Sequence, residues 1–205
     1  MSPEAPPAAA GGLRSRQRAE RRAAIIDAAV QIIATRGLAA VTHRAVAREA
    51  KVPLAATTYY FASKEEILRE ALESLSAAEV QRLGKLAEEI AALGSREAAG
   101  VALAKALVPD PDQGPRAWLA QFEIYLEAAR NPALRPAVEQ RRQAFVKLAV
   151  TALRAAGAPD PEGRAELGVA GLNGILFNRV RELGEDPQQE MLDRLAQLFE
   201  LLLRP

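Results

Sequence analysis

Cysteine is absent from this chain of 205 residues, and histidine occurs only once, as His43. The missing cysteines exclude disulfides, thiolate metal ligands and cysteine nucleophiles, and they suit a reducing compartment such as the cytoplasm. A single histidine leaves a histidine metal cluster without its second ligand, and the sequence has no glycine-rich phosphate loop. We therefore expect no metal site, no cofactor and no enzyme; a site built from carboxylates alone is the remaining enzymatic alternative.

Long apolar runs are also missing, because charged residues interrupt every stretch before it reaches the ~20 residues that a membrane helix needs. Residues 1–13 are rich in proline, alanine and glycine, but they lack the basic start and apolar middle of a secretory signal. We interpret residues 1–13 as a flexible tail, and we expect the protein to be cytoplasmic.

Strand-forming patterns are scarce, whereas Ala, Leu, Glu, Arg and Gln, which favour helices, dominate the composition. Gly37 is suited to end a helix, and the pairs Asn131-Pro132, Asp160-Pro161 and Asp186-Pro187 are typical of helix starts. The proline-rich segment 109–115 is the best candidate for a mobile loop. The sequence predicts an all-α fold of about nine helices, at residues 17–36, 43–50, 54–60, from 64 onward, 96–108, 115–130, 132–156, 161–183 and 187–203.

The positive charge is concentrated near the start of the chain. Residues 1–64 contain ten Lys or Arg and four acidic residues, whereas the remaining residues contain seventeen Lys or Arg and twenty-two acidic residues. A local basic excess is what a surface for a polyanion needs, because Lys and Arg displace counterions from phosphate. A basic surface that is merely solvated is the alternative.

Small apolar, aromatic and lysine residues recur at characteristic spacings between residues 21 and 68. They are Ile25-Ile26-x-Ala28-Ala29, Gly37, Thr42, Val46-Ala47-x-x-Ala50, Val52, Tyr59-Tyr60-Phe61 and Ser63-Lys64-Glu65-x-Ile67-Leu68. In these residues the chain resembles the DNA-binding domain of the TetR family of bacterial transcriptional regulators. The resemblance implies a helix-turn-helix DNA-binding domain at residues 14–65. A long helix would join it to a helical effector-binding and dimerisation domain at residues 66–205.

The residues that would contact DNA follow from this resemblance. Arg44 is our choice for reading a guanine, since a bidentate arginine contributes about 1–3 kcal/mol of base discrimination; a phosphate contact and a solvated side chain are the alternatives. The second short helix would enter the major groove. Its first residues are Leu54, Ala55, Ala56, Thr57 and Thr58. The positions that commonly hold the DNA backbone are occupied by Thr42, His43, Tyr59, Tyr60 and Lys64.

Two other features bear on how this chain would bind DNA. Either Tyr59 or Tyr60 could pack against Phe61 instead of contacting DNA. The arginines near the start of the chain form an arm that either contacts DNA or is only solvated. They are Arg14, Arg16, Arg18, Arg21 and Arg22. Lys51 stands where the family often has glycine, and a positive φ there costs a lysine roughly 1 kcal/mol.

The C-terminal part offers candidates for an effector site and a dimer interface. Trp118, Phe122 and Tyr125 share a helix face and would line a pocket for a planar or apolar ligand, with ordinary core as the alternative; Phe145 and Phe177 are weaker candidates. Glycines inside a helix indicate close packing, and the family pairs its last two helices across a two-fold dimer. The predicted interface residues are Gly168, Gly171, Gly174, Leu195, Phe199 and Leu202.

The sequence therefore predicts a sequence-specific transcriptional regulator that binds pseudo-palindromic operator DNA as a homodimer. Repression that a small apolar or aromatic effector releases is what the family resemblance implies. The alternative is a helical adaptor or architectural protein that binds DNA without sequence preference or effector control.

Overall fold

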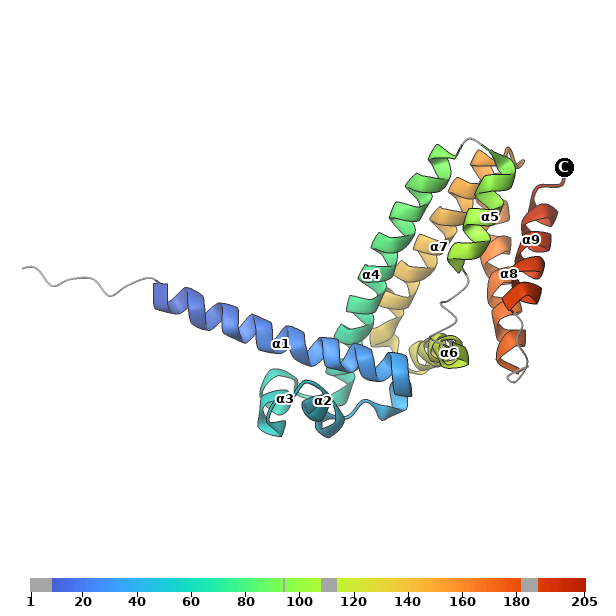
Figure 1. Ribbon diagram of the computed structural model, residues 1–205. Helices are drawn as coiled ribbons and strands as arrows, with labels where there is room; N and C mark the ends of the chain where they lie inside the picture. Colours follow the sequence, from blue (N-terminus) through green and yellow to red (C-terminus); the bar gives the residue numbers. More distant parts are fainter. Residues whose placement is uncertain (1–8, 94, 108–113, 182–187) are drawn as a thin grey trace, which may run out of the picture. The chain divides into compact units, whose positions relative to one another are not determined.

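The computed structural model describes residues 9–93, 95–107, 114–181 and 188–205. In these residues the chain is helical and contains no strand, as the sequence predicts (Figure 1). The α-helices are α1 (Ala9–Arg36), α2 (His43–Glu49), α3 (Leu54–Tyr60), α4 (Lys64–Ala92), α5 (Arg96–Leu107), α6 (Gly114–Arg130), α7 (Arg135–Ala155), α8 (Pro161–Arg181) and α9 (Gln188–Leu202).

The chain divides into two compact units, Met1–Ala71 and Leu72–Pro205. The division falls inside α4, six residues beyond the boundary that the sequence predicts. The first helix also begins earlier than expected: residues 9–13, assigned to a tail, belong to α1, and residues 1–8 lie outside the described residues. So do residues 108–113 of the predicted loop and the Asp186-Pro187 pair.

The first unit forms around one face of α1. Ile25, Ile32 and Ile33 are almost fully buried, at the helical spacing that puts them on one side of α1. Gly37 ends the helix with a positive φ of 81°, a conformation that glycine adopts without strain. The buried side chains that α2, α3 and α4 add to this core include Val46, Ala47, Thr57, Ile67, Leu68 and Ala71.

In the second unit, α7 and α8 pack together, and α9 packs against both α8 and α5 (Figure 1). Its main core joins Leu83 and Ile90 of α4 to Leu148 and Leu153 of α7 and Phe199 of α9. Side-chain caps mark two of the predicted helix starts. Asn131 accepts a hydrogen bond from the Ala133 amide, and Asp160 accepts one from the Gly163 amide at 3.2 Å. None of the described helices is long and apolar enough to cross a membrane.

Candidate nucleic-acid interface

The helices α2 and α3 are joined by a tight turn. Thr42 caps α2, because its Oγ1 accepts a hydrogen bond from the Ala45 amide at 3.1 Å. The turn closes with the Val52 amide donating to the Ala47 carbonyl at 3.0 Å, and Lys51 has a φ of 54°. The strain predicted at Lys51 is therefore present. Holding a lysine in this conformation costs roughly 1 kcal/mol, which the packing of α2 on α1 and on α3 must offset.

The exposure of α3 separates its residues into two groups. Leu54, Ala55, Thr58 and Tyr59 are exposed, so their side chains are available to a partner. Thr57 has no exposed surface, and its Oγ1 donates to the Leu54 carbonyl at 2.8 Å. The structure therefore gives Thr57 no exposed surface for the direct DNA contact that the sequence predicts.

Thr57 also contacts His43, the first residue of α2. The Nδ1 atom of His43 lies 3.2 Å from Thr57 Oγ1, and the imidazole is half-buried. The structure thus links one predicted DNA-backbone contact to a residue of the recognition helix. Tyr60 is half-buried and meets the ring of Tyr59 edge to face, with 5.0 Å between ring centroids.

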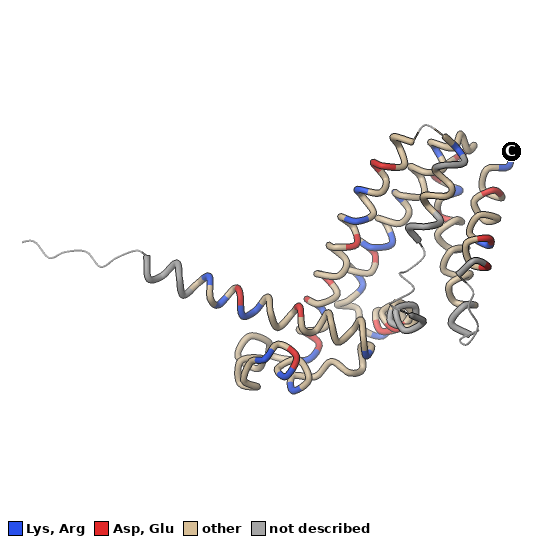
Figure 2. The backbone as a smooth tube through the Cα atoms, in the orientation of Figure 1, with Lys and Arg blue, Asp and Glu red and all other residues tan. Residues whose placement is uncertain are grey.

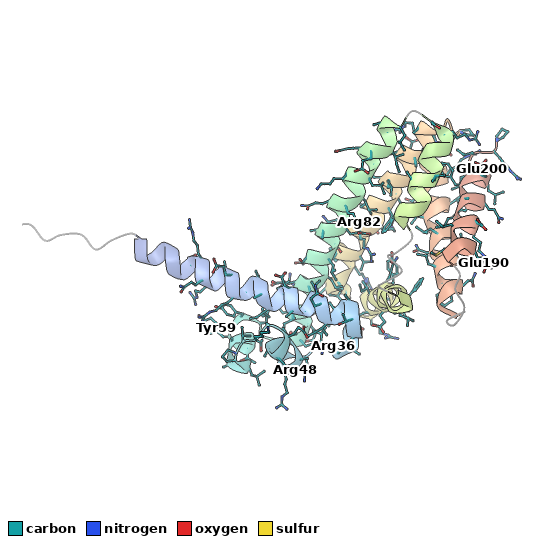
Figure 3. All side chains as sticks on the ribbon, viewed as in Figure 1. Arg36, Arg48, Tyr59, Arg82, Glu190 and Glu200 are labelled. Atoms are coloured by element: carbon teal, nitrogen blue, oxygen red, sulfur yellow. The ribbon has the colours of Figure 1, made fainter. Side chains whose placement is uncertain are left out.

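Tyr59 is 63% exposed and lies on the α1 side of α3 (Figure 3). Its hydroxyl accepts a hydrogen bond from the Arg18 guanidinium, and the Arg18 Cζ atom lies 5.5 Å from the centre of its ring. The phenol keeps its own proton, so it can still donate to a phosphate oxygen. Arg18 therefore holds the tyrosine from α1, and the first half of α1 is a helix rather than an extended arm.

Figure 2 shows where Lys and Arg lie along the backbone. The basic residues of the first unit differ in their partners. Arg22 pairs with Glu70 and lies over the Phe61 ring, and Arg36 pairs with Glu49 at 2.6 Å. The remaining cations of residues 15–64, among the side chains that the structure describes, have no ion pair. They are Arg16, Arg18, Arg21, Arg44, Arg48, Lys51 and Lys64, of which Arg18 binds the Tyr59 hydroxyl.

Arg44 and Arg48 lie four residues apart on one face of α2, and Lys51 follows in the turn after this helix. All three are exposed. Sequence reasoning selected Arg44 and overlooked Arg48, although its position four residues after Arg44 on one short helix was a readable signal. The three residues give α2 and the turn a set of exposed cations that is suited to a phosphate backbone.

The start of α4 carries a capping box with one change from the usual pattern. Ser63 Oγ accepts from the Glu66 amide at 3.2 Å, but the Glu66 carboxylate accepts from the Ala62 amide rather than from that of Ser63. Hydrogen bonds from its own amide and from Ser63 lower the pKa of Glu65, as do the nearby charges of Lys64 and His43. These bonds fix the helix start that carries Lys64.

The second unit contains an apolar hollow among α5, α7, α8 and α9. Its volume is about 540 Å³, counting space open to solvent. Phe145 and Phe199 supply the aromatic part of the lining, and none of the described residues that line it is charged. The other lining residues are Gly100, Leu103, Leu148, Ala149, Leu153, Gly168, Val169, Leu172, Leu195, Leu198 and Leu202.

The predicted effector residues separate in the structure. Phe145 lines the hollow, whereas Phe122 does not. Phe122 packs against the cluster of Leu172, Leu176, Met191 and Leu195, of which Leu172 and Leu195 also line the hollow. Phe122 and Phe177 meet edge to face with ring centroids 5.3 Å apart. Tyr125 is half-buried and does not line the hollow, and the side chain of Trp118 lies outside the described residues.

The predicted dimer residues are mostly occupied within the chain. Leu195 and Phe199 are 5% and 6% exposed. A Cβ added to Gly168 would lie 2.9 Å from Leu202, and one added to Gly171 would lie 2.9 Å from Leu198. Gly168 and Gly171 therefore lie against α9 within the chain, and Gly168, Leu195, Phe199 and Leu202 line the hollow. Their place in a dimer interface stays a prediction. Of the three predicted glycines, only Gly174 faces open space.

One polar cluster joins α4, α6 and α7. Glu79 accepts two hydrogen bonds from Arg82, at 2.8 and 3.0 Å, and lies 4.0 Å from Arg141. Burial favours the neutral carboxyl, but the bonds from Arg82 and the charge of Arg141 outweigh it and lower the pKa of Glu79. Arg141 also donates to Gln121 and lies over the Phe145 ring. The described residues contain no group of His, Asp and Glu arranged to hold a metal.

Two short helices joined by a tight turn, packed on a third helix and edged with unpaired cations, define a helix-turn-helix DNA-binding unit. Residues 25–71 match the family described as bacterial regulatory proteins, tetR family. Residues 94–201 match the family described as tetracyclin repressor-like, C-terminal domain.

Similar proteins agree with both matches. The HTH-type transcriptional regulator BetI of Rhizobium meliloti is 32% identical over 164 residues, which cover 78% of this chain and 77% of BetI. A crystal structure of a transcriptional regulator from Rhodococcus sp. Rha1 has a TM-score of 0.74 at 23% identity, covering 89% of this chain and 95% of its own. The multidrug binding protein EbrR, crystallised with proflavin, has a TM-score of 0.63 at 28% identity, covering 87% and 98%.

The chain belongs to the TetR family of bacterial transcriptional regulators. It is accordingly a DNA-binding regulator of transcription and not an enzyme.

Proposed function

We propose that this protein is a repressor that binds a pseudo-palindromic operator as a homodimer and is released from it by a small apolar or aromatic molecule. The observation that carries the DNA-binding part is the set of exposed, unpaired cations on α2 and the following turn, next to the exposed residues of α3. Because such a regulator acts on the bacterial chromosome, its proposed location is the cytoplasm.

In this proposal the residues have distinct tasks. Arg44 reads a guanine, and the exposed α3 residues Leu54, Ala55 and Thr58 meet base edges and thymine methyl groups, with half-buried Ala56 beside them. The hydroxyl of Thr42, the ring of His43, the tyrosines Tyr59 and Tyr60, and Lys64 hold the backbone. Arg48 and Lys51 are added to the phosphate contacts on the basis of their exposure.

The hollow in the second unit is the proposed effector site. Its lining is apolar and includes two phenyl rings, a composition that favours an uncharged apolar or aromatic ligand. The complex of EbrR with proflavin, a planar aromatic compound, supports an aromatic ligand. Phe145 keeps its predicted role, and Phe199 joins it.

The proposed dimer interface is the exposed side of α8, which contains Gly174 of the three glycines that the sequence indicated. Leu167 and Phe177 of α8 are 67% and 60% exposed. Ala170 and Gly174 lie between them, and the spacings of three, four and three residues put all four on one side of the helix. A second copy of the chain is the proposed occupant, since an exposed apolar stripe on a helix marks an association surface.

Selection from a pool of random duplex DNA tests the proposal. We expect the protein to enrich one pseudo-palindromic site. In a screen, planar aromatic and uncharged apolar compounds should then release the protein from this site. Recovery of unrelated sequences would favour the architectural alternative. If no compound releases the protein from the enriched site, the DNA-binding part of the proposal stands and the effector part is contradicted.

A further inference from the structure

His43 and Thr57 form a hydrogen-bonded pair that determines which imidazole nitrogen faces outward. Thr57 Oγ1 has a single proton, and it donates that proton to the Leu54 carbonyl at 2.8 Å. Toward His43 Nδ1, 3.2 Å away, the hydroxyl can therefore only accept. The proton between the two residues belongs to Nδ1 of His43.

The other nitrogen, Nε2, is then left without a proton whenever the ring is neutral. Nε2 has no hydrogen-bond partner among the described residues. Every buried side-chain nitrogen or oxygen in these residues has a hydrogen-bond partner, so Nε2 is not buried and reaches the surface. His43 begins α2 beside Thr42 and Arg44, on the edge that we assign to DNA. A neutral Nε2 offers a lone pair, which a phosphate oxygen cannot bind; a protonated Nε2 offers a hydrogen bond and a positive charge.

We propose that Thr57 is a positioning residue that fixes the tautomer of His43, so that His43 contacts an operator phosphate only as the imidazolium. The inference rests on the proposed DNA-binding function. Binding then takes up one proton per subunit, so operator affinity rises as the pH falls.

The charged surroundings of His43 are few. Glu65, at the start of α4, interacts with the charge of His43, and Lys64 interacts with the same carboxylate. Arg44 is the neighbouring charge on α2, and α3 contributes no Asp, Glu, Lys or Arg. Because His43 is the sole histidine, its titration can be observed without overlap.

The first test reads the tautomer without DNA. Long-range proton–nitrogen NMR spectra of the full chain, labelled with nitrogen-15 in histidine, identify the protonated nitrogen of the neutral ring. We expect Nδ1–H in the wild type and in Thr57→Ser, which keeps the hydroxyl. In Thr57→Val, which has no acceptor at this position, we expect Nε2–H. Nε2–H in the wild type, or Nδ1–H retained in Thr57→Val, would overturn the proposal.

The second test measures affinity for the duplex selected from the random pool, at constant salt, from about pH 8 to pH 6. We expect the wild type and Thr57→Ser to bind roughly fivefold to tenfold more tightly at the acidic end, the effect of one charge-assisted contact. In His43→Gln and Thr57→Val the change should be less than about twofold on the same argument. The helical circular dichroism of each variant reports its folding.

The possible outcomes separate this inference from the proposed function. A wild type that binds the selected duplex with equal affinity at every pH would contradict the role of His43 while leaving the regulator intact. If the protein enriches no duplex, both the role of His43 and the proposed DNA-binding function are contradicted. If Thr57→Val does not fold, the wild-type spectrum and the comparison with His43→Gln decide the question.

Discussion

At the residue scale, Arg44 and Arg48 share an exposed face of α2 but have different proposed tasks. Replacing Arg44 with alanine should remove about 1–3 kcal/mol of discrimination at one base pair of each half-site. Replacing Arg48 with alanine should weaken binding to all duplexes alike and reduce the slope of log affinity against log salt by about 0.9 for each phosphate that is no longer neutralised. Affinity measurements on the selected duplex and on single-base variants of it distinguish the two. Equal weakening on every sequence for Arg44→Ala would show that it binds phosphate instead.

The residues of α3 show what the sequence could and could not predict at this scale. The spacing and composition of the sequence placed this helix correctly, at residues 54–60. They also selected Leu54, Ala55 and Thr58, which the structure leaves exposed. The sequence could not show that Thr57 points inward, because threonine suits a buried and an exposed helix position equally well. The hydrogen bond to His43 joins residues fourteen positions apart, and only the packing of α2 against α3 creates it.

At the scale of helices, two glycines offer a matched test of packing. Gly84 of α4 has no neighbouring atom within 4 Å of an added Cβ, whereas at Gly100 of α5 the Cβ would lie 2.9 Å from two ring carbons of Phe199. Gly84→Ala should raise the free energy of unfolding by about 0.5–1 kcal/mol, because alanine favours helices. Gly100→Ala should lower it by about 1–3 kcal/mol, because a phenyl ring in a packed core yields poorly.

Urea unfolding followed by circular dichroism, with both variants at one protein concentration, measures this difference. Two variants of equal stability would show that α5 and α9 do not approach each other closely through Gly100 and Phe199. The caps and glycines made most of these helix ends predictable. The sequence could not predict which helix packs against which face. The apolar face of α8 at Gly168 and Gly171, for example, suits a neighbouring helix from the same chain or from another chain.

At the scale of the whole molecule, the proposed dimer depends on the exposed stripe of α8. Leu167→Glu places a charge on that stripe, and burying an unpaired carboxylate in an interface is costly. We expect this variant to sediment as a monomer at a micromolar concentration at which the wild type is a dimer. Leu126→Glu, at a leucine of α6 that is 57% exposed, is the control and should leave the dimer intact. A monomeric wild type, or a dimeric Leu167→Glu, would contradict the assignment.

The most direct test of the central claim compares the selected duplex with a scrambled duplex of the same length and composition while the salt concentration rises. Nonspecific binding depends on counterion release and fades steeply with salt, whereas a specific regulator typically keeps a preference of about 10³-fold or more for its site. We predict that the protein still binds the selected duplex when it has left the scrambled one. Release of both duplexes at the same salt concentration would contradict the claim that this chain is a sequence-specific regulator.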